Sequence, residues 1–138
     1  MRASVTPERR QTFFEGRMTL MHYPLVEDER GCLLPLEWPH LPFSPVHAFV
    51  VTASHSSVRG GHAHRSGEQL LIRIAGSIEL EARHAGQTEQ VCLDADSNAV
   101  LIKAPVWARQ TYRGRDATLL VFAGAPYDPK SLIYDSSS

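Results

Sequence analysis

The chain lacks the features that mark several large classes of protein. It has only two cysteines, Cys32 and Cys92, without the CxxC spacing of metal and redox motifs, and no apolar run approaches the length that crosses a bilayer. The first ten residues, MRASVTPERR, hold no apolar signal core. These absences predict a cytoplasmic protein with reduced thiols and no membrane segment.

An excess of charge of one sign is also missing. The formal net charge is -1 and 21% of the residues are charged, so no strong field exists to attract nucleic acid or an anionic membrane. We therefore expect no nucleic-acid partner, and small ligands remain the open class. At 138 residues the chain is predicted to form a single domain, residues 1–138, with flexible ends at 1–11 and 136–138.

Long segments of helical period are absent, and short apolar segments separated by turns take their place. Pro39, Pro42 and Pro45 exclude a helix from the 37–45 region. Turns at Gly76 and at 113–116 are predicted to end strands. The predicted strands lie within 12–23 and at 48–53, 69–75, 77–84, 88–93, 99–104, 109–112 and 117–123. This pattern favours an all-β sandwich or barrel.

The chemistry is predicted to lie in the segment 59–76, RGGHAHRSGEQLLIRIAG. On an extended strand His62 and His64 leave the backbone on the same face, roughly 7 Å apart, while Ala63 faces the other way. Two titratable groups then reach one bound molecule. Considered alone, such a pair is also explained by surface or core histidines whose nitrogens form hydrogen bonds with backbone groups. The residues on either side of the pair favour a functional site instead.

The flanks carry a resemblance. His62-x-His64, four residues, Gln69, six residues and Gly76 resemble the first cupin motif, with glutamine where metal-binding cupins usually have glutamate. The combination more closely resembles the dTDP-sugar 3,4-ketoisomerase family. The segments that carry this resemblance are DERG at 28–31, RGGHAH at 59–64, PVWARQ at 105–110 and LLVFAGAPYDP at 119–129.

The resemblance implies an all-β cupin jelly roll, a double-stranded β-helix of two antiparallel sheets, commonly a homodimer with exchanged N-terminal strands. It also implies that the keto group of a dTDP-4-keto-6-deoxy-hexose moves from C4 to C3 without a metal or another cofactor. The residues suit this chemistry, because a C4 ketone acidifies the C3 hydrogen and an imidazole of ordinary pKa near 6.5 can remove it. His62 and His64 are the candidate catalytic residues, and which is base and which acid stays open.

A metal site is the alternative for a histidine pair. Cupin metals usually take a glutamate after the pair and a third histidine on a later strand, and here these positions hold Gln69 and Ala108. Glu68 is one place off, so on a strand it points to the opposite face. Two imidazoles and a neutral amide hold a transition metal poorly, and we expect none.

Six residues are candidates for binding the substrate: Arg59, Gln69, Arg73, Trp107, Arg109 and Tyr127. Arg59 suits a diphosphate, Trp107 suits stacking on thymine or the hexose, and the Tyr127 hydroxyl suits the sugar. Each also has a plain structural explanation, as a solvated arginine, a packed aromatic or a charged edge. Simple alternation sends Arg73 to solvent, whereas the resemblance turns Gln69 and Arg73 into the barrel.

Some positions depart from the family. The basic pair usual after the Pro-Phe of the proline-rich loop is replaced by Ser44, Pro45, Val46 and His47, and the chain ends in KSLIYD before its final serines. These changes affect the binding of the substrate more than the proton transfer. They keep two alternatives open: a related epimerase or cyclase that acts on another enolisable natural-product substrate, and a sugar-binding cupin without catalysis.

Overall fold

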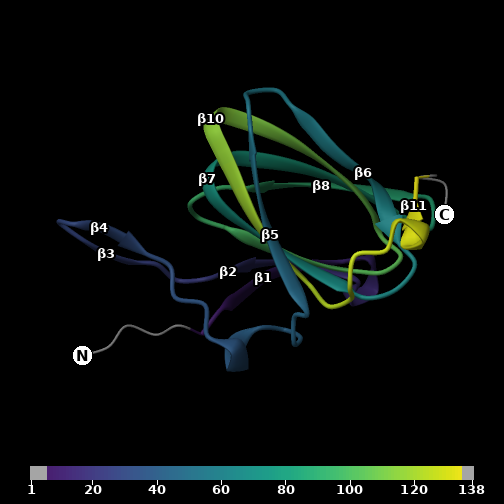
Figure 1. Cartoon of the computed structure of the whole chain (residues 1–138), viewed down its shortest axis with the longest axis horizontal. Helices are drawn as coiled ribbons and strands as arrows, with labels where there is room; N and C mark the ends of the chain where they lie inside the picture. Colours follow the sequence, from purple (N-terminus) through teal and green to yellow (C-terminus); the bar gives the residue numbers. More distant parts are fainter. Residues whose placement is uncertain (1–5, 135–138) are drawn as a thin grey trace.

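A computed structural model describes residues 6–134, which form eleven strands with three short 3-10 helices between some of them (Figure 1). The strands are β1 (Glu8–Phe13), β2 (Met18–His22), β3 (Val26–Asp28), β4 (Gly31–Leu33), β5 (His47–Ala53), β6 (Val58–His64), β7 (Glu68–His84), β8 (Gln87–Leu93), β9 (Ala99–Lys103), β10 (Trp107–Ala123) and β11 (Leu132–Ile133). The 3-10 helices are η1 (Phe14–Gly16), η2 (Trp38–His40) and η3 (Pro129–Ser131).

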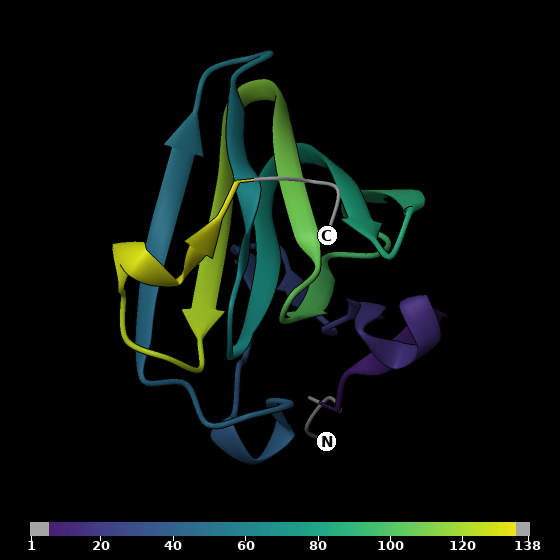
Figure 2. The same ribbon diagram turned by 90° about the vertical axis from the view of Figure 1, so that its right-hand side faces the viewer.

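Two long strands, β7 and β10, form the centre of the sheet structure. They pair antiparallel along most of their length, and each is shared between two layers. The first half of β7 pairs with β9 and its second half with β8, while β10 pairs with β6 at its start and β5 at its end. All pairings are antiparallel, and the two layers enclose a common interior (Figures 1 and 2). This is the jelly roll that the motif predicts.

The long strands correct one expectation from the sequence. Gly76 and residues 113–116 were expected to separate strands, yet β7 and β10 both continue through these positions. Positive φ angles at Gly76 (+71°) and Gly114 (+97°) bend the chain, and the register of the β7–β10 pair shifts between Arg113 and Thr118. The residues that favour turns therefore bend each strand from one layer into the other.

Alternation along β7 decides which side chains face the interior. Leu71 is buried in a cluster with Leu119 and Val121 inside the roll. Leu70 and Ile72 belong to a second cluster, which aromatic and aliphatic side chains of the 34–43 segment cover on the outside. Because Gln69 shares the parity of Leu71, it faces the interior, as the family resemblance implies and simple alternation did not.

A strand begins within the N-terminal region that the sequence predicts to be flexible. Residues 8–11, expected to be flexible, belong to β1, whose backbone pairs with β2. Five of its six residues are exposed, so hydrogen bonds between the strands, more than burial, hold it in place. The flexibility expected at 1–5 and at 136–138 lies outside the described residues.

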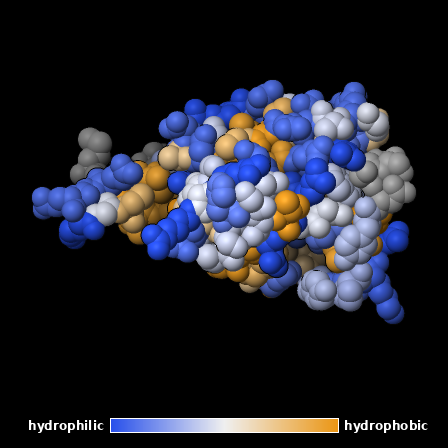
Figure 3. Space-filling view, turned by 90° about the horizontal axis from the view of Figure 1, so that it is seen from above, coloured by the Kyte–Doolittle hydropathy of each residue, from blue (hydrophilic) through white to orange (hydrophobic). Residues whose placement is uncertain are grey.

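The β3–β4 hairpin stands apart from the rest of the structure. Its strands pair only with each other and form a separate two-stranded sheet. It extends away from the body, with a hydrophilic tip and apolar side chains behind it (Figures 1 and 3). Leu33 at its end is 61% exposed. No helix in the described part of the chain is long and apolar enough to span a membrane.

Candidate active site

The histidine pair lies on β6, between β10 on one side and β11 on the other. His62 is level with Ala108 of β10, and His64 is level with Leu132 of β11. Ala63, between them, is fully buried on the opposite face. The two imidazole rings stand edge to face, with centroids 5.3 Å apart and planes at 87°. The expected shared face is therefore present, and the rings are close enough to act on one molecule.

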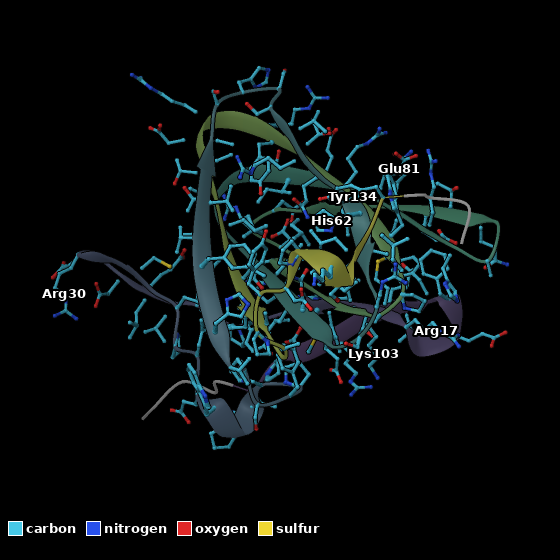
Figure 4. All side chains as sticks on the ribbon, turned by 45° about the vertical axis from the view of Figure 1, so that its right-hand side comes forward. Arg17, Arg30, His62, Glu81, Lys103 and Tyr134 are labelled. Atoms are coloured by element: carbon cyan, nitrogen blue, oxygen red, sulfur yellow. The ribbon has the colours of Figure 1, made fainter. Side chains whose placement is uncertain are left out.

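Both histidines line an internal cavity of about 140 Å³. The aromatic, amide and ionisable side chains around it are His47 and Phe49 from β5, His62 and His64 from β6, Glu68 and Gln69 from β7, Lys103 from β9, and Tyr127 and Asp128 from the C-terminal segment, residues 124–134. Figure 4 shows His62 and Lys103 among the side chains of this region. Five separate parts of the chain therefore build one site.

A second hollow of about 150 Å³ adjoins the first. The two share Phe49, His62 and Gln69, so they lie on either side of these residues. The second hollow extends toward Arg59 and Tyr112. Two adjoining hollows that both border His62 suit a ligand of two linked parts.

Burial sets the charge of the histidine rings. It lowers the pKa of His62, and it lowers the pKa of His64, where a charge on His62 lowers it further. A contact with the Gln69 amide offsets part of the effect on the His64 pKa. Nδ1 of His62 and Nε2 of His64 are buried and have no hydrogen-bond partner within the described residues. Both rings are therefore biased toward the neutral form, each with a nitrogen free to bind a ligand.

Three of the expected substrate-binding residues line this space. Gln69 borders both hollows beside His64, and Arg59 borders the second hollow. Tyr127 lies at the rim of the first cavity with 73% of its surface exposed. The structure gives the positions of these three side chains, and their roles in binding stay predictions.

The other three lie elsewhere. Arg73 donates from Nε to the Gly76 carbonyl at 2.6 Å, and so supports the bend in β7. Trp107 and Arg109 alternate with Ala108, which faces inward, and therefore lie on the outer face of β10. There Arg109 pairs with Glu81. The structure does not bring these three side chains to the cavity.

Sequence reasoning missed several residues of the site. His47 lines the cavity and stacks on Phe49 at 5.8 Å between ring centroids. The one sequence signal for His47 was its position in the segment that replaces the basic pair usual in the family. Lys103 lies opposite Glu68 in the β7–β9 pair, and both border the cavity. Lys103 lacked a signal, because the pairing that brings it there joins strands distant in sequence.

The C-terminal segment closes one side of the cavity. Its strand β11 pairs with the end of β6, and η3 begins where the Asp128 side chain accepts from the Lys130 amide at 3.0 Å. Backbone and side-chain groups of Arg65 bond to Ser131 and Lys130 and attach this segment beyond the histidines. The Tyr134 ring meets His62 edge-on at 5.8 Å, and Figure 4 shows the two side by side.

The donors around the histidines do not resemble a metal site. Ala108, where a third histidine was sought, is buried directly beside His62. Gln69 is a neutral amide where a carboxylate was sought. Within residues 6–134, His, Cys, Asp and Glu side chains nowhere form a group of three suited to hold a metal ion.

An antiparallel jelly roll with two histidines of one strand facing its interior defines the class of protein as a cupin. The chain belongs to the family described as FdtA: WxcM-like, C-terminal, which matches residues 16–138. The family assignment expected from the motif is thereby confirmed.

Relatives at the limit of sequence similarity agree with this assignment. The chain is 25% identical over 121 residues to TDP-4-oxo-6-deoxy-alpha-D-glucose-3,4-oxoisomerase of Aneurinibacillus thermoaerophilus, covering 85% of this chain and 87% of the relative. QdtA, a sugar 3,4-ketoisomerase from Thermoanaerobacterium thermosaccharolyticum solved in complex with TDP, aligns with a TM-score of 0.78 and 25% identity over 86% of this chain and 88% of that one.

Two further solved structures extend the comparison. A 3,4-ketoisomerase from Helicobacter canadensis aligns with a TM-score of 0.77 and 26% identity, covering 86% of this chain and 90% of that one. A dTDP-4-dehydrorhamnose 3,5-epimerase from Bacillus anthracis aligns with a TM-score of 0.80 at 14% identity, over 92% and 82% of the two chains, and shares the fold alone. The comparisons confirm the expected enzyme class, an isomerase.

Proposed function

We propose that this protein is a metal-independent 3,4-ketoisomerase of a dTDP-4-keto-6-deoxy-hexose, with His62 and His64 as the proton-transfer pair. The observation that carries the proposal is the pair itself: two imidazoles 5.3 Å apart, facing one cavity, each with an unpartnered buried nitrogen. A binding site alone does not need two titratable rings on one face. The ketoisomerase relatives support the choice of reaction.

The reaction moves two protons and leaves the formula of the sugar unchanged. One imidazole in its neutral form takes the proton from C3, and the C3–H electron pair forms the C3–C4 double bond of an enediol while the C4 oxygen gains a proton. The O3 hydroxyl then loses its proton as the C3 ketone forms, and C4 gains one. Because a charge on His62 lowers the pKa of His64, the pair favours carrying one proton at a time. Such a pair holds an acid and a base together.

The two adjoining hollows suit the two parts of the substrate. With the hexose beside the histidine pair, the diphosphate and nucleoside extend into the space beyond it, where Arg59 offers a guanidinium to phosphate oxygens. Lys103 offers an ammonium and His47 an imidazole on the other side. Gln69 contacts the hexose between them, and the Tyr127 hydroxyl borders the rim. Arg73, Trp107 and Arg109 are not among the contacts we propose.

The experiment follows hydrogen at C3. The protein is incubated with dTDP-4-keto-6-deoxy-glucose in deuterated water containing a chelator, and the products are examined by NMR. We expect deuterium incorporation and a new 3-keto signal. His62→Asn and His64→Asn are each expected to lower the rate at least about 100-fold, the usual contribution of an acid–base group, while the fold is retained.

The control for these variants is His84→Asn, because His84 packs edge-on against Phe14 away from the cavity. It should keep full activity. Full activity in both cavity variants would reject the site, and loss of activity on chelation, restored by a divalent metal, would reject metal independence.

The epimerase or cyclase alternative rests on the departures from the family pattern near the cavity. His47 lies where family members usually carry a basic pair, so the side chains available to bind the nucleotide differ. Deuterium exchange without a new ketose in the same experiment would favour this alternative. Measurable binding of the nucleotide sugar with no exchange at all would favour a non-catalytic sugar-binding cupin.

We also propose that the protein is a homodimer that acts in the cytoplasm. The isolated β3–β4 hairpin supports the dimer, since a lone two-stranded hairpin is marginally stable in water and this one exposes Leu33. A second copy would cover it. The two exposed, unpaired cysteines fit a reducing compartment.

Sedimentation of the intact protein tests the dimer. A mass near twice 15.4 kDa is expected, with a shift toward the monomer in Leu33→Asp. The exposed Val58→Asp, on β6 outside the hairpin, provides a matched comparison. A monomer at all concentrations would contradict the proposal.

A further inference from the structure

Trp107 joins two parts of the chain that are far apart in sequence. It opens β10, is 6% exposed, and donates from its indole Nε1 to the backbone carbonyl of Tyr134 at 3.3 Å. The bonds from Arg65 to Lys130 and Ser131 and the pairing of β11 attach the residues just before Tyr134, and the indole bond reaches Tyr134 itself. Since Trp107 does not line the cavity, its large side chain needs an explanation other than contact with the substrate.

Tyr134 in turn contacts the reacting pair. In the antiparallel register Leu132 is level with His64 and Ile133 with Ala63, so the next residue falls beside His62. The Tyr134 ring stands edge-on to the His62 ring, at 5.8 Å and 79°. A series of contacts therefore links the Trp107 indole, through the Tyr134 carbonyl and ring, to the His62 imidazole.

The Trp107 ring is itself fixed from outside the barrel. The Arg83 guanidinium lies 4.9 Å and that of Arg109 5.7 Å from the centre of the indole ring. Both arginines pair with Glu81, so one carboxylate holds two cations against one ring. This cluster gives the indole a defined orientation, and its N–H bond then defines where the last strand lies.

We propose that Trp107 and Tyr134 are positioning residues for His62. The indole N–H fixes the Tyr134 backbone, and the Tyr134 ring then covers one side of His62, limits the rotation of the imidazole and keeps water from it. Arg65 holds Lys130 and Ser131, and β11 pairs through Leu132 and Ile133, so the indole bond acts on the next residue, Tyr134 itself. The catalytic part of the inference rests on the proposed function, and the structural part does not.

Other titratable residues near His62 are unchanged in the variants that test this. Those facing the cavity are His47 from β5, His64 on its own strand, Glu68 from β7, Lys103 from β9 and Asp128 from the C-terminal segment. Arg59 and Tyr112 face the adjoining hollow. A change in the titration of His62 in these variants then reports its exposure to water.

The test is the NMR titration of the His62 ring, assigned by comparison with His62→Asn, and it needs no substrate. Burial lowers the pKa of His62. In Trp107→Phe and Tyr134→Ala, water reaches the ring, and we expect the pKa to rise by about 0.5 unit toward its ordinary value. Tyr134→Phe keeps the ring and should keep the wild-type titration.

Trp38→Phe is the matched control, because Trp38 is 56% exposed and packs edge-on to Phe122, on the other hydrophobic cluster. It should leave the His62 titration unchanged. If neither Trp107→Phe nor Tyr134→Ala moves the His62 pKa, or if Trp38→Phe moves it equally, the inference is wrong.

Turnover with the proposed substrate adds a second readout. A misplaced His62 should lower kcat about tenfold in Tyr134→Ala with KM nearly unchanged, because the substrate contacts remain. A rise in KM alone would overturn the positioning role and make Tyr134 a binding residue. Should wild-type protein show no ketoisomerase activity, the proposed function fails, while the titration still decides the contact between Tyr134 and His62.

Discussion

Gln69 is the single residue that most separates this site from a metal-binding relative. It borders both hollows and contacts His64 with a neutral amide. An amide offers either a donor or an acceptor, so it serves the ring in both protonation states without fixing the charge. A carboxylate at this place would stabilise the charged ring, which is unsuited to removing a proton.

Gln69→Glu tests this argument. A carboxylate against the His64 ring should raise its pKa by about one unit or more, since an opposite charge at contact distance favours the imidazolium. The acid limb of the pH profile of kcat/KM should then move upward, so the rate near pH 7 falls and recovers at higher pH. Gln90→Glu on the exposed edge of β8 makes the same charge change far from the cavity and should leave the profile alone. An unmoved acid limb in Gln69→Glu would contradict the contact.

At this scale the sequence predicted side chains near the motif better than distant ones. The shared face of His62 and His64 follows from alternation along one strand, and the inward position of Gln69 follows from the family motif. Arg73 and Arg109 were expected at the site and do not line the cavity, because the bend in β7 and the outward parity of Arg109 depend on strand pairing. Tyr134 carried no signal, since its contact with His62 exists only through the pairing of β11 with β6.

The bends in β7 and β10 decide the shape of the cavity at the scale of elements. Gly76 lies where β7 crosses from one layer to the other and packs against Ala117 and the Arg113 carbonyl of β10. Sequence reasoning recognised these residues as interruptions and took them for strand ends. The difference between a turn and a bend depends on whether the neighbouring strand bends as well, and no local pattern contains that information.

Gly76→Ala tests the close approach of the two strands. A Cβ there would lie 2.7 Å from both the Ala117 Cβ and the Arg113 carbonyl oxygen, at a φ of +71°. Overpacking and backbone strain together should lower the free energy of unfolding by about 2–4 kcal/mol, measured by urea denaturation. Gly86→Ala is the matched control, with a φ of +78° and open space, and should cost only about 1 kcal/mol. Equal losses in the two variants would mean that the crowding has no effect.

At the scale of the whole molecule, the jelly roll gathers distant segments around two buried bases. Composition and strand pattern were sufficient for the all-β class, and the motif for the cupin fold and its family. The cavity itself needed β5, β6, β7, β9 and the C-terminal segment together. The basic side chains that it gathers, His47 and Lys103, were therefore beyond local reasoning.

Enclosing two histidines has a consequence for the stability of the whole fold. Burial lowers the pKa of both rings below the ordinary value near 6.5, so the unfolded chain binds more protons than the folded one as the pH falls below that value. The free energy of unfolding therefore holds a contribution that is fully present above about pH 6.5 and is lost on acidification through the lower folded-state pKa values.

The melting temperature, measured at intervals from pH 7.5 to pH 5, should accordingly fall less steeply in the double variant His62→Asn/His64→Asn than in the wild type. The carboxylates of Asp28 and Glu81 do not obscure the comparison, because hydrogen bonds from Arg30 and Arg83 lower their pKa values below the ordinary range and they titrate at lower pH. His84→Asn, which leaves the cavity intact, should follow the wild-type curve more closely than the double variant does. If the wild type and the double variant lose melting temperature in parallel across this range, the two rings are not desolvated in solution, and the acid–base site proposed for them loses its physical basis.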